Sequence, residues 1–246
     1  MNPIGISDTG RHRDNNEDSY FLSGVPFCGL PNLYIVADGI GGHNAGEVAS
    51  KEAIRFFKKY CRKNRVNRDE ILDFIVGGVV YVNDNVMEMS LENKDYIGMG
   101  TTFSACVYDN GRLYIAHVGD SRIYGIYDDK IRQLTTDHSY VNELVKAGSI
   151  TEEEARSHPK RNVLTQAIGT DSQLMVDGKV IELADCRKVI LCTDGLTDMV
   201  PENELLLSAK SNNNEEIAKS LVNLANQNGG TDNITLIIFD VGGGPE

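Results

Sequence analysis

The chain has 246 residues, of which 41% are hydrophobic and 24% charged, a composition typical of a globular protein with one large or two small domains. Its formal net charge of −12 argues against nucleic acid as a partner, because phosphate backbones bind basic surfaces. The five cysteines are scattered, the first residues lack a signal-like pattern, and no apolar stretch is long enough to span a bilayer. We therefore expect a cytoplasmic protein without a membrane partner, and a monomer by default.

Strand-like and helix-like periodicities alternate in blocks along the sequence. In chain order they predict strands at 20–23 and 33–37, helices at 45–62 and 69–92, strands at 101–108, 113–118 and 123–127, short helices at 140–147 and 152–156, strands at 179–183 and 188–192, a helix at 215–228 and a strand at 233–240. Asp109-Asn110-Gly111 predicts a hairpin turn. This order indicates an α+β fold with packed antiparallel sheets flanked by helices, rather than repeated βαβ units.

Three segments carry further expectations. Residues 138–169 interrupt the strand pattern with short helical pieces, which predicts a mobile flap over a site. Gly77-Gly78 weaken the second long helix, so we expect another backbone to pack closely against them. Residues 208–215, with three successive asparagines, are expected to form a surface loop.

Eight basic residues gather in one short stretch of this acidic chain. They are Lys51, Arg55, Lys58, Lys59, Arg62, Lys63, Arg65 and Arg68. One interpretation is a docking patch for an acidic partner. The other is a solvated helix whose C-terminal cations complement the helix dipole.

Four aspartates lie at the ends of almost wholly apolar strand segments: Asp38, Asp120, Asp194 and Asp232. Glycine stands beside the first three and leaves room for backbone to approach a ligand. If these carboxylates gather, each pair repels by about 3 kcal/mol at about 5 Å and an effective dielectric of about 20, so a cation is needed among them. Hard oxygen ligands without histidine or cysteine favour Mg²⁺, Mn²⁺ or Ca²⁺ over zinc. Asp-Gly is also common turn chemistry, but four such sites together favour the metal interpretation.

Paired cations of this kind can hydrolyse phosphate esters. Two metal ions about 4 Å apart acidify a bridging water to hydroxide, which attacks in line while the ions bind the oxygens of the transferred group. A phosphoryl substrate also needs a positive group from the protein. Arg13 is the candidate, because a guanidinium can hold two phosphate oxygens.

A specific family resemblance is carried by eight sequence blocks that span nearly the whole chain. They are residues 7–18, 37–43, 99–102, 118–122, 134–139, 158–165, 192–196 and 230–235, and they include Ala37-Asp38-Gly39-Ile40-Gly41-Gly42-His43, Val118-Gly119-Asp120-Ser121-Arg122 and Gly230-Thr231-Asp232-Asn233-Ile234-Thr235. In this order they resemble the motifs of the metal-dependent, type 2C-like (PPM) serine/threonine protein phosphatases. The compact length and the Ile-Gly-Gly-His form are similar to the bacterial branch.

The resemblance implies a four-layer α-β-β-α sandwich, a single catalytic domain over residues 1–246, and two or three Mn²⁺ or Mg²⁺ ions per chain. It implies that Asp38 bridges two ions and that Gly39 gives its carbonyl to one of them. Asp194 and Asp232 would hold the other ion, and Asp120 would support a weaker third one.

The same resemblance implies that Arg13 binds the substrate phosphate. Glu17, Asp18 and Asn233 would orient metal-bound waters. The reaction would be hydrolysis of phosphoserine and phosphothreonine in proteins, without a phosphoenzyme. The expected partners are phosphorylated proteins, among them a serine/threonine kinase and its substrates, whose signalling the enzyme would reverse.

Several points stay open at the level of sequence. His43 and His138 match family histidines and could donate a proton to the leaving group or bind substrate, but a metal-bound water could be the acid instead. The ligand set does not choose between Mn²⁺ and Mg²⁺. The substrate could also be a small phosphometabolite, or the protein could be a metal-binding regulator that recognises phosphoproteins without turnover.

Two weaker signals point to other chemistries. Cys106 and Arg112 have the spacing of cysteine-dependent phosphatases, but the residues between them read as a strand entering a hairpin. The glycines of residues 39–42 are similar to a dinucleotide-binding loop, but Asp38 would repel a pyrophosphate there. Neither signal outweighs the carboxylate pattern.

Overall fold

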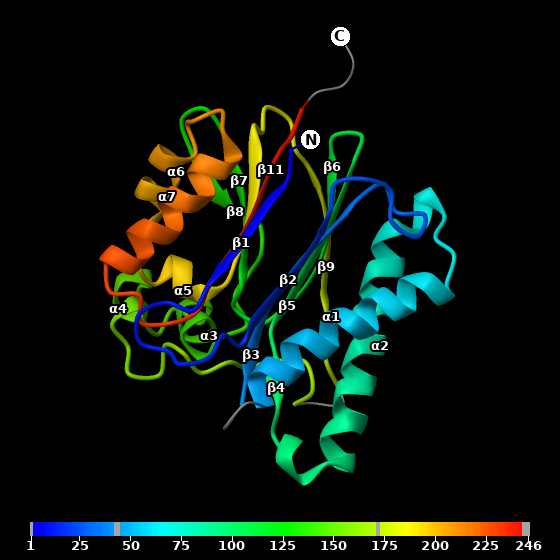
Figure 1. The fold of residues 1–246 in the computed structure, drawn as a ribbon. Helices are drawn as coiled ribbons and strands as arrows, with labels where there is room; N and C mark the ends of the chain where they lie inside the picture. The colour runs from blue at the N-terminus through cyan, green and yellow to red at the C-terminus, as the bar shows by residue number, and fades with distance from the viewer. Residues whose placement is uncertain (1, 42–44, 171–172, 243–246) are drawn as a thin grey trace.

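Two antiparallel β-sheets lie face to face, and each is covered on its outer side by helices (Figure 1). The computed structural model describes residues 2–41, 45–170 and 173–242. The layers follow the order helix, sheet, sheet, helix, which confirms the α+β sandwich expected from the sequence.

The first sheet has the strand order β1-β11-β10-β7-β8. Its strands are β1 (Ile4–Asp8), β11 (Ile234–Asp240), β10 (Lys188–Cys192), β7 (Arg122–Ile126) and β8 (Ile131–Gln133). The second sheet has the order β2-β3-β5-β6-β9, with β4 paired beside β3. Its strands are β2 (Asp18–Ser23), β3 (Leu33–Ile40), β4 (Gly100–Thr101), β5 (Phe103–Asp109), β6 (Arg112–Val118) and β9 (Asp177–Glu182).

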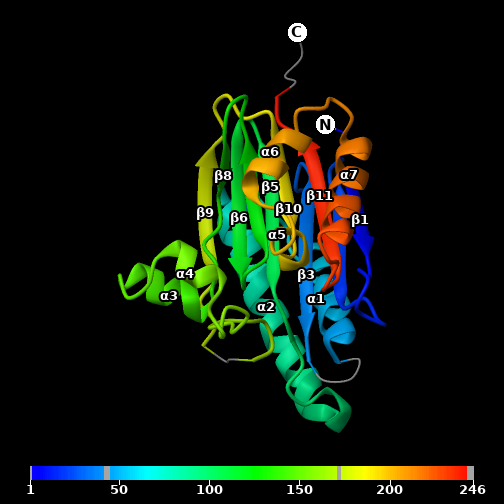
Figure 2. The same cartoon turned by 90° about the vertical axis from the view of Figure 1, so that its left-hand side faces the viewer.

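The helices divide between the two outer layers. The second sheet is covered by α1 (Ala45–Lys63) and α2 (Ile71–Glu92), and short 3₁₀ turns, η1 (Arg68–Glu70) and η2 (Lys94–Tyr96), flank α2. The first sheet is covered by α5 (Asp194–Thr197), α6 (Glu202–Ser208) and α7 (Asn214–Gln227). Figure 2 shows α3 (Tyr140–Lys146) and α4 (Glu152–Arg156) to one side of the sheets. No helix in the described part of the chain is both long and apolar enough to cross a bilayer.

The sheets are apolar on both faces because both faces are covered. Between the sheets, Tyr34 of β3 stacks on Phe239 of β11 with ring centroids 4.1 Å apart. Alternate residues of β3, such as Ile35 and Ala37, face the α1–α2 layer instead and are fully buried there. This double burial explains why the strand segments read as continuous apolar runs rather than as alternating ones.

Among the described residues, β1, β8, η2, α5 and α6 were not predicted from periodicity. They have five, three, three, four and seven residues, and such short elements give little periodic signal. The predicted hairpin is confirmed, since Asn110 and Gly111 have φ angles of 48° and 82°, as a type I′ turn requires. The predicted surface loop is confirmed at residues 209–213, between α6 and α7.

The expectation of a second backbone against Gly77-Gly78 is wrong. A Cβ on Gly78 would lie 2.6 Å from a ring carbon of Phe57, and one on Gly77 would lie 3.0 Å from the Tyr60 hydroxyl. Both aromatic residues belong to α1. Because Gly77 and Gly78 have no side chains, α2 can pack directly against the aromatic rings that project from α1.

The basic stretch lies on α1 and in the turn that follows it. Lys51 and Arg55 form ion pairs with Glu47 and Glu52 on the same helix. The ammonium of Lys58 lies 4.4 Å from the centre of the Phe21 ring. These contacts fit the interpretation as a solvated helix.

Candidate active site

The strand ends that carry aspartates meet at one end of the sandwich. β3 and β6 both pair antiparallel with β5, so Asp38 and Asp120 lie at the same end of the strands of the second sheet. β10 ends where its antiparallel partner β11 begins, which brings Asp194 and Asp232 to the same end of the strands of the first sheet. The four side chains thus come from loops and strand ends that are far apart in the sequence.

Electrostatics show that these carboxylates act on one another across the two sheets. Burial raises the pKa of Asp38 well above its ordinary value, and the charges of Asp18, Asp194, Asp120 and Asp232 raise it further. The group keeps some contact with solvent, but protein surrounds it on most sides. A cluster of this kind resists full ionisation unless a positive charge is added.

Asp194 is affected in the same way. Its pKa is raised to about 6, mainly by burial and also by the charges of Asp198 and Asp232, while a hydrogen bond with Asp38 opposes the rise. Asp198 lies one helical turn beyond Asp194, and sequence reasoning did not select it. Asp198 is the residue that follows the four-residue helix α5, and so short a helix leaves no periodic signal in the sequence.

Asp18 is the most deeply buried acid of the cluster, with 6% of its surface exposed. Its Oδ2 accepts a hydrogen bond of 2.9 Å from the Thr193 hydroxyl, whereas its buried Oδ1 has no partner among the described residues. Its pKa is raised to about 7, mainly by burial, with hydrogen bonds from Thr235 and Thr193 opposing the rise and the charges of Asp194 and Asp232 adding to it. The carboxylate therefore destabilises the metal-free protein when it is ionised.

The substitution Asp18→Asn is expected to stabilise the metal-free protein relative to wild type, and increasingly so as pH rises from about 4 to about 7. Unfolding lets Asp18 ionise near its ordinary pKa of 3.8, whereas the folded protein holds the proton to about 7. The folded state thus binds more protons in this window, and wild-type stability falls by roughly 3 kcal/mol relative to the variant. Urea unfolding with a chelator, at about pH 5 and about pH 7.5, measures the difference.

Comparing the two proteins at each pH cancels contributions that both share. One such contribution comes from His117, whose pKa burial lowers to about 4 and which therefore favours folding as pH rises. A stability difference that stays constant over this pH range would contradict the assignment of the raised pKa to Asp18.

The loop before β2 brings Arg13 to the cluster. One guanidinium nitrogen of Arg13 donates to Oδ2 of Asp232 over 2.8 Å, and the arginine side chain remains 47% exposed. The side chain of Asn233 holds this loop, because its nitrogen donates to the carbonyls of Thr9 and Asn15 and its oxygen accepts from the Glu17 N–H. Asn233 therefore holds the loop of Arg13, and its role toward a metal-bound water stays a prediction.

Glycines next to the aspartates allow backbone segments to approach one another closely. A Cβ on Gly39 would lie 2.1 Å from the carbonyl oxygen of Gly46 in α1. A Cβ on Gly195 would lie 2.0 Å from the carbonyl oxygen of Asn233. Neighbouring backbone thus lies where a side chain would be at both positions, and at Gly195 that backbone belongs to Asn233, which follows Asp232.

His138 lies beside the cluster and supports the loop of Asp120. Its Nδ1 accepts the Gly119 N–H over 3.2 Å, and its Nε2 lies 3.7 Å from Asp177 of β9. The His138 ring is buried, and its centroid lies 5.0 Å from that of the His117 ring. Both ring nitrogens thus face protein groups. His43, the other candidate acid, lies outside the described residues.

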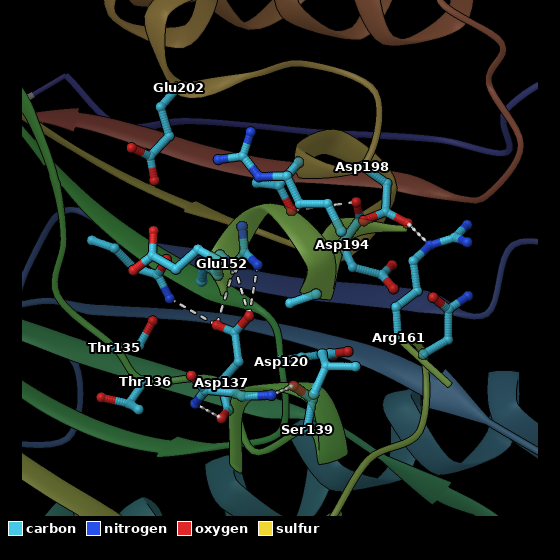
Figure 3. A pocket seen from close by; sticks show the side chains of 18 of the residues that line it. Asp120, Thr135, Thr136, Asp137, Ser139, Glu152, Arg161, Asp194, Asp198 and Glu202 are labelled. Atoms are coloured by element: carbon cyan, nitrogen blue, oxygen red, sulfur yellow. Dashed lines mark hydrogen bonds and ion pairs between the residues drawn. The ribbon is translucent and has the colours of Figure 1, made fainter. Parts of the chain in front are cut away.

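A cleft of about 770 Å³ opens next to Asp120 and Asp194 (Figure 3). Arg122 and Asp137 both line this cleft and form a bidentate ion pair, with nitrogen–oxygen distances of 2.6 to 3.1 Å. One wall comes from the segment predicted as a flap, whose α3 and α4 line the cleft. The Nε of Arg161 in this segment lies 4.0 Å from Oδ2 of Asp198, which also lines the cleft.

The signals for other chemistries find no support in the structure. Cys106 is fully buried between the sheets, and burial raises the pKa of its thiol far from any range in which it would ionise. Arg112 is instead exposed and pairs with Glu182. The glycine loop follows a strand of an antiparallel sheet, not a βαβ unit, and part of it lies outside the described residues.

The donor set suits hard divalent cations. The cluster offers carboxylate oxygens whose mutual repulsion needs a counter-charge, and a buried oxygen of Asp18 lacks a partner within the described residues. In residues 2–41, 45–170 and 173–242, no three acidic, histidine or cysteine side chains are arranged to hold one ion by themselves. Mg²⁺ commonly binds proteins through one or two carboxylates and keeps several waters, so the carboxylates of this cluster fit such an ion.

Comparison with known proteins identifies the family of this chain and agrees with its fold. The family model of protein phosphatase 2C matches residues 11–232. The serine/threonine phosphatase stp of Listeria monocytogenes is 38% identical over 240 residues, covering 95% of this chain and 93% of that protein. The protein phosphatase PhpP of Streptococcus pneumoniae is 36% identical over 239 residues, covering 96% of both.

Solved structures show the same architecture. The serine/threonine phosphatase Stp1 from Staphylococcus aureus superposes with a TM-score of 0.91 at 36% identity, covering 98% of this chain and 95% of that one. The phosphatase PstP/Ppp of Mycobacterium tuberculosis does so with a TM-score of 0.87 at 33% identity, covering 98% of both.

The four-layer fold and these relatives define a hydrolase of the serine/threonine phosphatase class. The chain belongs to the protein phosphatase 2C family, whose members are metal-dependent enzymes.

Proposed function

We propose that this enzyme hydrolyses phosphoserine and phosphothreonine in proteins, using Mn²⁺ or Mg²⁺ ions held by the carboxylate cluster. The observation that carries the proposal is the raised pKa of Asp38, which burial and four neighbouring carboxylates produce together. A site that needs positive charge, lies beside a cleft and belongs to this family suits metal-dependent phosphate hydrolysis.

The cations would be held by residues from both sheets. Asp38 would lie between two ions, with the carbonyl of Gly39 on one of them and Asp194 and Asp232 on the other. Asp120 would support a third, weaker ion. When bound, the ions would supply an acidified water and neutralise the charge of the phosphoryl oxygens.

The protein's own groups would position the substrate around this centre. Arg13 is exposed at the edge of the cluster, where its guanidinium can take phosphate oxygens in place of Asp232. Glu17 and Asp18 would accept hydrogen bonds from waters around the ions. His138 is occupied by Gly119 and Asp177, so we assign it a supporting role and leave proton donation to His43 or to a bound water.

The cleft would receive the polypeptide that carries the phosphorylated side chain. Residues 138–169, which form one wall, would act as a flap within a single catalytic domain. The stem of this segment is held by a bridge between Ser139 and Leu164 and by another between Thr101 and Ile168. The proposed partners are phosphorylated proteins, including a serine/threonine kinase and its substrates.

The test is phosphate release from a phosphothreonine peptide, with protein stripped of metal by a chelator and then supplied with Mn²⁺. Release is expected only after Mn²⁺ is added, because the carboxylates cannot bind phosphate without a counter-charge. Turnover that survives chelation would contradict the proposal. A preference in kcat/KM for small phosphate esters over phosphopeptides would reassign the substrate, and tight peptide binding without release would indicate a non-hydrolysing regulator.

A further inference from the structure

We propose that Thr102 is a positioning residue whose hydroxyl group sets the geometry of Asp38 and Asp120 together. The inference rests on the proposed function, because it concerns the cation ligands assigned there. Thr102 lies in the short gap between β4 and β5 and is 1% exposed.

Thr102 and its neighbour clamp the backbone of Asp38 on both sides. The Asp38 N–H donates to Oγ1 of Thr102 over 2.9 Å, and the Thr102 N–H donates to the Asp38 carbonyl over 2.8 Å. The Thr101 hydroxyl donates to the same carbonyl over 2.8 Å. The Thr102 hydroxyl thus takes the place of a backbone carbonyl as hydrogen-bond acceptor for the N–H of Asp38, the residue that would bridge the ions.

The register of the strands shows why a side chain is needed here. The pairing of β3 with β5 ends at Val36, and its pairing with β4 begins at Gly39. Asp38 falls in the gap between these two ladders. The Thr102 hydroxyl therefore holds a backbone N–H that regular sheet pairing leaves free.

The same hydroxyl reaches the loop of Asp120. Oγ1 of Thr102 lies 2.7 Å from Oγ of Ser121, which is fully buried and directly follows Asp120. The methyl side of Thr102 packs against Gly119, which precedes Asp120: a Cβ on Gly119 would lie 2.6 Å from both Cβ and Cγ2 of Thr102. Thr102 thus contacts the residues on both sides of one aspartate and the backbone of another.

This arrangement predicts that the hydroxyl supports metal binding separately from packing. Thr102→Val keeps the methyl group and removes the hydroxyl, whereas Thr102→Ser keeps the hydroxyl and removes the methyl group. We expect the valine variant to bind Mn²⁺ about tenfold more weakly than wild type, and the serine variant to stay within about threefold. Calorimetric titration of metal-stripped protein with Mn²⁺ alone measures this, and thermal unfolding without metal shows that both variants are folded.

A second variant tests the link to Asp120. Ser121→Ala should also weaken Mn²⁺ binding, and adding it to Thr102→Val should have little further effect, because both changes break the same hydrogen bond. Wild-type affinity in folded Thr102→Val, equal losses in the valine and serine variants, or additive effects in the double variant would each overturn the inference. The titration uses no substrate, so failure of phosphate release would count against the proposed function and not against the role of Thr102.

Discussion

Asparagine in place of Asp38 is expected to reduce phosphate release by about a thousandfold or more, and at the same time to stabilise the metal-free protein. The two effects have one cause. Asp38 is surrounded by four other carboxylates that raise its pKa, so its charge is unfavourable until cations bind. Asparagine has the same shape without that charge, and relief of repulsion should add about 2 kcal/mol to the stability without metal.

The measurements are the steady-state rate on a phosphothreonine peptide at saturating Mn²⁺, and thermal unfolding with a chelator and with Mn²⁺. Mn²⁺ should raise the melting temperature of wild type and have little effect on the variant. Asp84→Asn is the matched control, because Asp84 is an exposed acid on α2. A variant that loses activity and is also less stable without metal would show that Asp38 has a structural role instead.

The sequence allowed the cluster to be predicted because its signal is local. An apolar run followed by aspartate shows both a buried strand and a charge at its end, so Asp38, Asp120, Asp194 and Asp232 could be selected before any contact was known. Burial on both faces of each sheet produces those runs. The family motifs supplied the further assignment of roles.

The remaining features depend on contacts between segments far apart in sequence. The partners of His138 are Gly119, which follows β6, and Asp177 in β9, and neither can be inferred from the residues around the histidine. The role of Thr102 depends on a gap between two strand ladders, which has no sequence pattern. Short elements such as α5 were missed because four residues carry no period.

Glycine shows most clearly where sequence reasoning was incomplete. The sequence predicts that Gly39 and Gly195 let backbone approach a ligand, and the structure adds that carbonyl oxygens of Gly46 and Asn233 lie where their side chains would be. Gly195 lets the backbone after Asp194 touch the backbone that carries Asp232, and Gly39 lets the backbone after Asp38 touch α1. A sequence shows that the side chain is absent, but not which atoms occupy the space.

Alanine in place of Gly195 is therefore expected to damage both the fold and the site. Its Cβ would lie 2.0 Å from the Asn233 carbonyl oxygen, a distance that forces the backbone after Asp194 away from the backbone that carries Asp232. Overpacking of this kind costs about 3 kcal/mol. Because catalytic groups must be held to within about 0.5 Å, we expect turnover to fall by roughly a hundredfold and Mn²⁺ affinity to fall with it.

Gly77→Ala is the matched control for the same chemical change. Its Cβ would meet only the Tyr60 hydroxyl, at 3.0 Å, at the far end of a flexible side chain. Alanine also favours the helical conformation that Gly77 already has in α2, so this variant should be neutral or more stable by up to about 1 kcal/mol. Urea unfolding, Mn²⁺ titration and phosphopeptide turnover of both variants form the test. If Gly195→Ala kept wild-type Mn²⁺ affinity and turnover, the close contact between these two backbones would not be what holds Asp194 and Asp232 in register.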